Sequence, residues 1–443
     1  MKISWISPED LLTHELRQRS EEGLDVREFG RRWETIRESG ETADAIRAAA
    51  RKLHSELQLL SPPDELLKNE PSELPAIRAA RPENPLRLPA ANRAESALVD
   101  RISGGWLGRS AGCLLGKPVE KTPRAGIREM LVASGNWPLS DYITAKGVPD
   151  HLLKKYPWNR HSGRESLREN IVCMTEDDDL NYPMINLSVL ETAGANFRTE
   201  DIAEAWLSLM PVLRSFTAER IAYINCLQLI DPPETARVNN PFREWIGAQI
   251  RADVWGWISP GNPGNAAALA WRDARLSHVQ NGIYGEMFFA AVIAAAFACN
   301  DPAELLQHGL NQIPANSRLA EAIRFVLQLP SREPDFEAAV DRIYERFGDF
   351  HWVHTINNAA LVAAALLFSN GDFETAICNV VMGGWDTDSN GATVGSIMGT
   401  MLGEQRLPAK WIDPLNDRIR SSLRGFDNSS IRELARRTYQ LVL

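Results

Sequence analysis

The stretch GGWLGRSAGCLLG, from Gly104 to Gly116, says more about the fold of this chain than any other segment. Its glycines recur every fourth residue, which places them along one face of a helix. A second stretch, GATVGSIMGTMLG from Gly391 to Gly403, repeats this spacing. A glycine inside a helix costs roughly 1 kcal/mol relative to alanine, so each ladder gives up about 3 to 4 kcal/mol. Close backbone packing is the compensation that we expect.

For either ladder taken alone, a glycine-rich loop is the alternative interpretation. The residues between the glycines favour a helix, because they are apolar and compatible with helical structure. They are Trp106, Leu107, Cys113, Leu114 and Leu115 in the first stretch, and Val394, Ile397, Met398, Met401 and Leu402 in the second. Two ladders of this kind predict two central core helices.

Acidic residues stand at one end of each ladder. Glu120 lies four residues after Gly116, the last glycine of the first ladder. Asp386, Asp388 and Ser389 lie just before the second ladder. N-capping is the alternative for Asp388 and Ser389, because side-chain oxygens there can satisfy free helix N–H groups. For Glu120 the alternative is an ordinary surface glutamate at a helix end.

A third acidic segment is Thr175-Glu176-Asp177-Asp178-Asp179. Many acidic runs are solvated turns, and that is the alternative here. The residues that follow, Leu180, Met184 and Leu187, lie at helical spacing, which attaches the acidic run to a buried helix. Adjacent carboxylates near a core repel one another and need a cation or strong hydrogen-bond donors.

The types of side chain limit which cation is expected. Glu, Asp, Thr and Ser offer hard oxygens, which suit magnesium, manganese or calcium and suit zinc or copper poorly. The five cysteines are dispersed and odd in number, as expected of buried thiols in a reducing compartment.

These blocks and their order along the chain resemble the signature blocks of the ADP-ribosylglycohydrolases, the group typified by the dinitrogenase reductase-activating glycohydrolase. The blocks are the glycine ladder that ends in Glu120, the Thr-Glu-Asp-Asp-Asp segment, and the Gly-Trp-Asp-Thr-Asp-Ser segment from Gly384 to Ser389. The resemblance covers roughly Ala97 to Leu443. It implies an all-α fold, a compact orthogonal helical bundle, with two Mg²⁺ or Mn²⁺ ions in a central cleft.

Carried over position by position, the resemblance implies six metal ligands: Thr175, Glu176, Asp177, Asp386, Asp388 and Ser389. The chain departs from the usual Thr-Asp-Asp-Thr block, since Glu176 replaces the first Asp and Asp178 replaces the second Thr. Ser389 stands where Thr is common. These departures put the metal spacing and the substrate preference in question, and leave the fold assignment unaffected.

The resemblance also implies the catalytic and substrate-binding residues. Glu120 is expected to do general acid-base work next to the substrate ribose, together with Asp177. Substrate contacts are expected from Asp178, Arg251, Trp255, Gly256 and His278. Core aromatic packing is the alternative for the tryptophan, and a satisfied core residue is the alternative for the histidine.

The expected reaction is hydrolysis of an N- or O-glycosidic bond to ADP-ribose or a related ribosyl group. Two divalent ions would orient the ribose hydroxyls and a water molecule while a carboxylate assists cleavage at the anomeric carbon. The expected substrate is an ADP-ribosylated protein or a small ADP-ribosyl or ribosyl metabolite. Two alternatives stay open: a nucleoside N-ribosyl hydrolase, and a non-catalytic crystallin-like relative. The leaving group is not specified by the sequence.

Composition narrows the range of partners. The chain has 443 residues, 44% of them apolar and 24% charged, and a formal net charge of −10, which argues against general nucleic-acid affinity. The longest apolar run, Met287 to Cys299, is far shorter than the ~20 residues that a membrane helix needs. The chain start lacks the apolar core of a signal peptide, so we expect a cytoplasmic protein without a membrane partner.

The first part of the chain has a different organisation. Ile46, Ala50, Leu53, Leu57 and Leu60 form a heptad-like apolar seam, and seven prolines follow within the 28 residues from position 62 to 89. We therefore predict a helical appendage over residues 1–60, a proline-rich linker or strap over 61–95, and the catalytic domain over 96–443. Three roles are open for the appendage: packing on its own domain, pairing with a second chain, and binding another partner.

Overall fold

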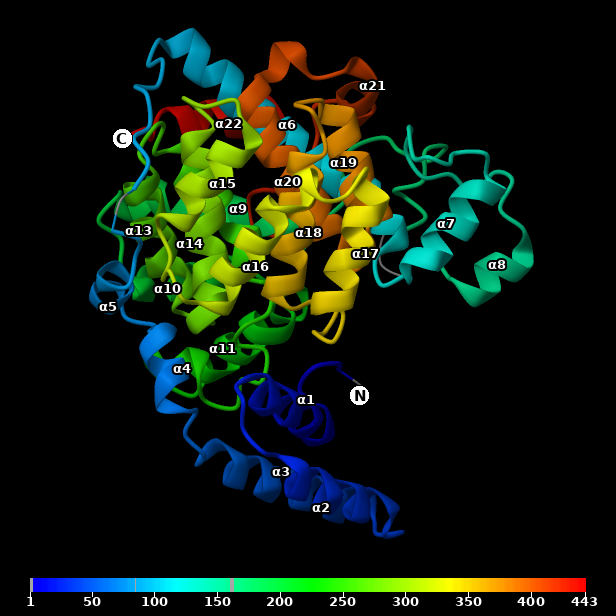
Figure 1. Cartoon of the computed structure of the whole chain (residues 1–443), viewed down its shortest axis with the longest axis vertical. Helices are drawn as coiled ribbons and strands as arrows, with labels where there is room; N and C mark the ends of the chain where they lie inside the picture. Colours follow the sequence, from blue (N-terminus) through cyan, green and yellow to red (C-terminus); the bar gives the residue numbers. More distant parts are fainter. Residues whose placement is uncertain (1–2, 84, 160–162) are drawn as a thin grey trace.

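Helices form nearly all of the regular structure of this protein, as the computed structural model of residues 3–83, 85–159 and 163–443 shows (Figure 1). In these residues, β-structure is limited to isolated bridges such as Met174 with Ile419. The expectation of an all-α fold is confirmed. No helix in the described parts of the chain is long and apolar enough to cross a membrane.

The two glycine ladders lie on the central helices α6 (Glu95–Gly116) and α20 (Thr387–Leu402), which run antiparallel to each other. A Cβ on Gly108 would overlap the carbonyl oxygen of Gly395, and a Cβ on Gly395 would overlap the carbonyl oxygen of Gly108. The same reciprocal relation joins Gly104 with Gly399 and Gly112 with Gly391. The expected close backbone packing is thus confirmed, and each ladder turns out to be the partner of the other.

Further helices enclose this pair. Helices α9 (Asp178–Ala193), α18 (Thr355–Leu367), α19 (Phe373–Met382) and α22 (Ile431–Tyr439) pack against α6, α20 or both. Helix α14 (Gln280–Ala295) is buried along its whole length, as expected for a helix without a polar face. Helix α12 (Asp253–Trp257) is likewise buried. The outer helices are α7 (Arg124–Ala133), α8 (Asp150–Lys155), α10 (Thr199–Leu209), α11 (Thr217–Leu227), α13 (Pro263–Ala274), α15 (Pro302–Leu310), α16 (Arg318–Leu327), α17 (Phe336–Phe347) and α21 (Ala409–Ile412).

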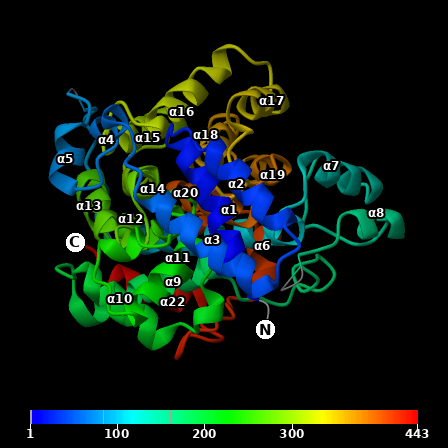
Figure 2. The same cartoon turned by 90° about the horizontal axis from the view of Figure 1, so that it is seen from below.

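Three N-terminal helices form an appendage below the main body (Figures 1 and 2). They are α1 (Pro8–Glu21), α2 (Arg27–Glu38) and α3 (Ala43–Gln58), and they share a small apolar core of their own. That core contains Ala50, Leu53 and Leu57 of the predicted seam, together with Leu12 and Trp33. Helix α1 lies between this core and the main body, so the appendage packs on its own chain.

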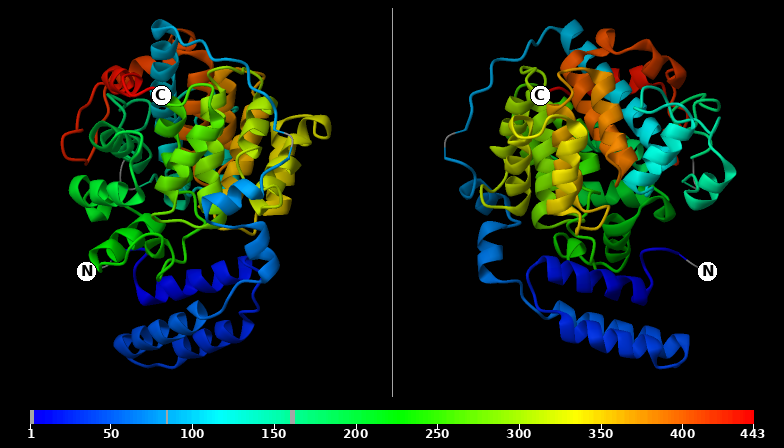
Figure 3. Two further views of the ribbon diagram at one scale, coloured as in Figure 1. Left: turned by 90° about the vertical axis from the view of Figure 1, so that its left-hand side faces the viewer. Right: turned by 45° about the vertical axis from the view of Figure 1, so that its right-hand side comes forward.

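The proline-rich segment follows the surface of the main body toward α6 (Figure 3). It contains two short helices that the proline count did not predict, α4 (Asp64–Asn69) and α5 (Leu74–Ala79). After α5 the chain is held by backbone groups: the Ala315 N–H donates to the Ala80 carbonyl over 2.8 Å, and Arg81 Nε donates to the Gln312 carbonyl over 3.0 Å. The segment is therefore a strap lying on the main domain.

The glycine contact predicts a large cost for a single added methyl group. We expect Gly395→Ala to lower the free energy of unfolding by at least about 2 to 3 kcal/mol, because the new Cβ meets a backbone carbonyl that cannot rotate away. Gly30→Ala is the matched control, since a Cβ at Gly30 of helix α2 meets nothing within 4 Å. That control should gain about 0.5 to 1 kcal/mol. Similar effects of the two substitutions in denaturant unfolding would contradict the backbone contact.

Candidate metal centre and active-site cleft

The antiparallel pair brings the C-terminal end of α6 beside the N-terminal end of α20. The chain leaves α6 through a short 3₁₀ turn, Lys117–Val119, and reaches Glu120 directly afterwards. At the start of α20, Thr387 Oγ1 donates to the Gly116 carbonyl over 2.8 Å, which ties the two ends together. The carboxylates of Glu120, Asp386 and Asp388 consequently converge, with one oxygen of each lying within 4.8 Å of the others.

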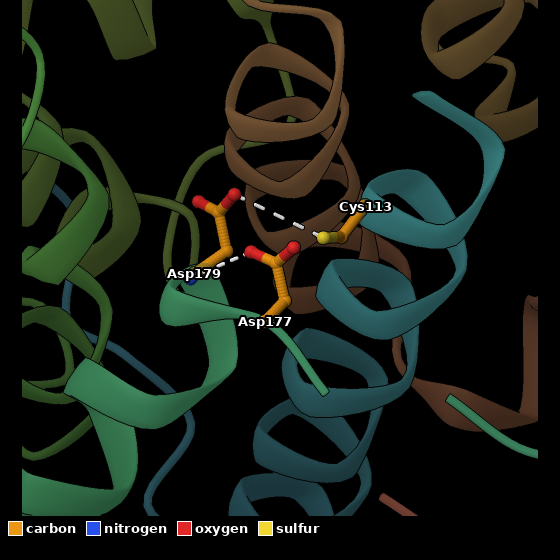
Figure 4. Close-up of side chains that lie close together, drawn as sticks. All are labelled: Cys113, Asp177 and Asp179. Carbon is orange, nitrogen blue, oxygen red and sulfur yellow. Dashed lines mark hydrogen bonds between the residues drawn. The ribbon is translucent and has the colours of Figure 1, made fainter. Parts of the chain in front are cut away.

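The start of α9 adds a second acidic group beside the first. Asp177 is the N-cap of α9, and its Oδ1 accepts a hydrogen bond from the Asp179 N–H over 2.9 Å. Both carboxylates face the thiol of Cys113 on α6, as Figure 4 shows. The carboxylate of Asp179 also accepts from Arg109 Nη2 at 3.2 Å and from Ser389 Oγ at 3.3 Å.

A lysine is built into this second group. The side chain of Lys117 is only 3% exposed, and its Nζ contacts Asp177 Oδ2 and donates to the Glu176 carbonyl over 3.0 Å. Burial alone would lower the pKa of Lys117, but Asp177 and neighbouring acidic groups hold this pKa above its ordinary value. No motif in the sequence singles out Lys117. A sign of its burial in the sequence was its position four residues after Cys113, which belongs to the apolar residues of the first ladder.

The carboxylates of the first group are strained electrostatically. Burial raises the pKa of Asp388 to about 8, with further contributions from Glu120 and Asp177. Burial and the nearby Asp388 and Glu120 likewise raise the pKa of Asp386 well above its ordinary value. Buried like charges of this kind need a cation to be stable in their ionised form. Asp386 is the N-cap residue of α20 but makes no side-chain capping bond within the described residues, whereas Asp388 Oδ1 accepts from the Ser389 N–H over 3.1 Å, in line with the capping alternative for Asp388.

These groups line a cleft that opens to the surface. Its wall and floor contain Glu176, Asp178, Arg214, Lys121 and Asn159, in addition to Glu120, Asp177, Asp386, Asp388 and Ser389. The carboxylate of Glu120 contacts Asn159 Nδ2 and accepts from Lys121 Nζ at 3.0 Å. With its side chain 13% exposed inside a cleft, Glu120 is not the ordinary surface glutamate of the alternative interpretation.

The structure places five of the six expected metal ligands along the cleft. Three of them, Asp177, Asp386 and Asp388, are buried carboxylates that line the cleft together with Glu120, and we call these four residues its acidic floor. Ser389 Oγ donates to Asp179 instead. The carboxylate of Glu176 pairs with Arg214 over 3.1 Å and accepts from Asn181. Thr175 is not among the described residues that line the cleft, and its hydroxyl lies 3.3 Å from that of Ser166.

The expected substrate contacts separate into two groups. Asp178 lines the cleft, whereas Arg251, Trp255, Gly256 and His278 lie in the core and are not among its described lining residues. Arg251 is fully buried between Glu219, at 2.7 Å, and Asp273, at 3.0 Å.

The other three residues of the core group also have internal partners. Trp255 Nε1 donates to Glu286 over 2.9 Å, His278 Nδ1 lies 2.8 Å from the hydroxyl of Ser277, and Gly256 packs on Ile293. Core packing, the alternative weighed for the tryptophan and the histidine, describes their positions. The family resemblance predicted that these residues contact the substrate. Matching sequence blocks does not show which face of a segment is buried, so it could not separate core residues from cleft residues.

Glu219 connects this buried network to the cleft, although sequence reasoning did not single it out. Its carboxylate pairs with Arg251 and lines the cleft, and burial raises its pKa to about 7 against the effect of that arginine. Gly247 makes room for it, since a Cβ there would overlap the carboxylate. The sequence gives no local signal for this residue.

A sequence model of the ADP-ribosylglycohydrolase family matches residues 94–442. The chain belongs to the ADP-ribosylglycohydrolase family. Both acidic groups and both glycine ladders lie inside the matched range, while the appendage and most of the strap lie outside it. Family membership supports a hydrolase of the glycosidase class.

Two further similarities accompany the family match. An uncharacterized protein of Archaeoglobus fulgidus is 27% identical over 207 residues, which is 45% of this chain and 59% of that protein. The chain therefore matches less than two thirds of this relative. A solved structure of an ADP-ribosylglycohydrolase-related protein complex is 20% identical, with a TM-score of 0.49, over 79% of this chain and 100% of the solved one.

The repulsion among the floor carboxylates predicts an unusual response to neutralising one of them. In metal-free protein at pH 8, we expect Asp386→Asn to raise the midpoint of thermal unfolding by a few degrees, because it removes a buried carboxyl whose ionised form the folded protein disfavours. Addition of Mg²⁺ should stabilise the unsubstituted protein and stabilise the variant much less.

Asp44→Asn is the control for that measurement, because the Asp44 side chain is 95% exposed in the appendage. It should leave both the midpoint and the response to Mg²⁺ unchanged. An Asp386→Asn variant that is less stable without metal, and that responds to Mg²⁺ like the unsubstituted chain, would show that these carboxylates do not form a cation site.

Proposed function

We propose that this member of the ADP-ribosylglycohydrolase family hydrolyses an N- or O-glycosidic bond at the ribose of an ADP-ribosyl group, with Mg²⁺ or Mn²⁺ as cofactor. The observation that carries the proposal is the convergence of Glu120, Asp386 and Asp388 at the floor of a cleft within the family-matched part of the chain. The substrate would be an ADP-ribosylated protein or a small ADP-ribosyl metabolite.

The donor set fits one hard divalent ion well. Asp386 and Asp388 are buried and offer the carboxylate oxygens that Mg²⁺ and Mn²⁺ prefer, while Glu120, with an oxygen within 4.8 Å of both, stands beside the ion that they would hold. The second of the two expected ions would use Asp177, and there Lys117 is a competitor because its ammonium already contacts that carboxylate. When bound, the ions supply a positive field that orients the vicinal hydroxyls of the ribose and polarises a water molecule.

The side chains of the cleft have separate tasks in this proposal. Glu120, held from one side by Asn159 and from the other by Lys121, is positioned to hold or release a proton at its carboxylate. Burial alone would raise the pKa of Asp177, but Lys117 brings this pKa below its ordinary value, so Asp177 stays an acceptor that can orient a water. Asp178, in the cleft wall, is proposed to contact the ribose.

The state of the cysteines bears on the compartment in which the protein works. All five cysteines, each in the described part of the chain, are free thiols, which favours a reducing compartment such as the cytoplasm.

The six residues Thr175, Glu176, Asp177, Asp386, Asp388 and Ser389 remain the proposed ligand set; Asp386, Asp388 and Asp177 carry the strongest geometric support. The nucleoside hydrolase remains the second candidate, since the acidic floor would serve ribose in either substrate.

Titration of metal-stripped protein with ADP-ribose tests the function most directly. We expect tight binding in the presence of millimolar Mg²⁺ and weak or absent binding without it, because the ribose hydroxyls need the ions as partners. Turnover of a nucleoside without any requirement for the diphosphate would instead favour the nucleoside hydrolase. No binding of ADP-ribose under either condition would refute the ADP-ribosyl proposal.

A Glu120→Gln variant separates binding from catalysis in the same titration. Glutamine keeps the shape and one oxygen acceptor of the side chain but cannot exchange a proton. Metal-dependent ADP-ribose binding should therefore be largely retained, while the rate of hydrolysis on a panel of ADP-ribosylated substrates falls about 10²-fold or more. Unchanged turnover would remove the acid-base role from Glu120.

The number of bound ions can be measured independently of activity. We expect two ions per chain by elemental analysis after equilibration with Mn²⁺ and desalting, with the second ion displacing the Lys117 ammonium from Asp177. Lys117→Met should then bind the second ion more tightly, since it removes the competing charge. One ion in the unsubstituted chain and two in the variant would mean that Lys117 takes the place of an ion. One ion in both would refute the two-ion site.

A further inference from the structure

The lining of the cleft contains an aromatic group as well as the acidic one. Trp5, Phe216 and Trp352 line the same cleft as the floor carboxylates, together with the aliphatic side chains of Ile246 and Val353. These side chains are apolar and the three aromatic ones are planar, so they suit a different part of a ligand from the part that carboxylates and a cation would hold.

A lysine joins the two groups. Lys121 Nζ lies 3.0 Å from Glu120 Oε1 and 5.4 Å from the ring centroid of Trp352. Arg214 is a second cation in the cleft wall. Along this part of the cleft, a carboxylate is thus followed by a cation and then by an aromatic ring. A ligand in which a ribose is followed by a charged phosphate group and a planar ring would match all three.

Trp5 is the one aromatic residue of this wall that comes from outside the family-matched range 94–442. It precedes helix α1, in a segment whose Ser4 carbonyl accepts from Arg220 Nη1 over 2.8 Å. The backbone of Trp5 has a φ of 67°, a conformation that non-glycine residues rarely adopt. Such a conformation persists only where the surroundings hold it, and it is common where a residue has a functional position.

A cluster of rings fixes the side chain of Trp5. Its ring centroid lies 5.7 Å from those of Phe242 and Trp245, both in edge-on contact, and 5.4 Å from that of His14. Burial lowers the pKa of His14 to about 4 and that of His351, a further member of the cluster, to about 3. Both imidazoles are therefore neutral at physiological pH, and the cluster behaves as apolar packing.

Helix α1 is in turn anchored to the main body by buried charges. Arg243 binds Glu15 at 2.8 Å and Glu22 at 2.7 Å, and Gln18 Nε2 donates to Glu244 over 2.6 Å. The side chains of Glu15 and of Glu22, which directly follows α1, are no more than 1% exposed. Breaking such buried pairs leaves an uncompensated charge, so the appendage is held in one position relative to the cleft. Trp5 is consequently presented to the cleft by a fixed element.

We propose that Trp5 is a specificity-determining residue that packs against a planar ring of the ligand, a nucleobase, while the ribose lies at the carboxylate floor. This inference rests on the proposed function. It gives the N-terminal appendage a role in the site: it completes the cleft of the family domain with an aromatic wall. A rigid, pre-positioned ring lowers the entropic cost of binding a base, which is why the anchoring of α1 matters for affinity.

The test compares two ligands on the full-length chain with millimolar Mg²⁺. Alanine substitution of a side chain that stacks on a base weakens binding by about 10- to 100-fold. We expect that loss for ADP-ribose with Trp5→Ala, and little loss with Trp5→Phe, which keeps a ring. Ribose 5-phosphate, which has no base, should bind the unsubstituted chain and Trp5→Ala equally well.

Trp137→Ala is the matched control, because Trp137 lies in a separate surface hollow beside Arg124 and Arg128. It should bind ADP-ribose like the unsubstituted chain. Equal ADP-ribose affinity of Trp5→Ala and the unsubstituted chain would overturn the role of Trp5 and leave the proposed function intact. A parallel loss for ribose 5-phosphate, not restored by Trp5→Phe, would also overturn it, since the residue would then only support the fold. If the unsubstituted chain fails to bind ADP-ribose, the proposed function fails and this inference with it.

Discussion

The backbone contact between α6 and α20 is the constraint on which the rest of the structure depends. Glycines at 104, 108 and 112 meet glycines at 399, 395 and 391, so the two helices approach more closely than any side chain would allow. This contact fixes the register of the pair as well as their distance, because a slip by one residue would bring larger side chains into the interface. The fixed register places Glu120 beside Asp386 and Asp388. The acidic floor is therefore a consequence of helix packing, and the stability lost by helical glycine is offset by a contact that also builds the site.

Around that floor, some of the buried carboxylates are paired with a cationic side chain and others are not. Asp179 has the guanidinium of Arg109, and Asp177 has the ammonium of Lys117, so the group at the start of α9 carries its own cations. Asp386 and Asp388 have burial and like charges around them, and their pKa values are raised for that reason. Lys117 sets Asp177 apart, because it lowers the pKa of that carboxyl, whereas burial and neighbouring carboxylates also raise the pKa values of Asp178 and Asp179. Asp386 and Asp388 have no ion-pair partner among the described residues, which gives a physical reason for the proposed metal to bind first between them.

The N-terminal appendage extends the family domain in two ways. Its core is independent of the main one, yet helix α1 is fastened to the main body by Arg243 and Glu244 through contacts that are almost wholly buried. The segment before α1 then reaches the cleft, which Trp5 helps to line. A segment outside the matched range thus contributes to the wall of a site whose chemistry lies within it. In this arrangement the family domain supplies the acidic floor, and the appendage helps to define the shape of the ligand that the cleft accepts.

The all-helical fold, the two central helices and the acidic segments beside them could be read from the sequence, because spacing of four and apolar periodicity are local properties of the chain. The pairing of the two ladders, the burial of Lys117 and the entry of Glu219 and Trp5 into the cleft could not be read in this way, since each depends on contacts between different helices or loops of the fold. For Arg251, Trp255 and His278 the sequence pointed to the cleft, whereas the fold turns them into a buried network around Asp273, Glu286 and Ser277. The sequence alone determined which chemistry is available to this protein, because that follows from residue type and local spacing. Only the tertiary structure decided which of these groups face the cleft, because exposure is set by the packing of distant helices.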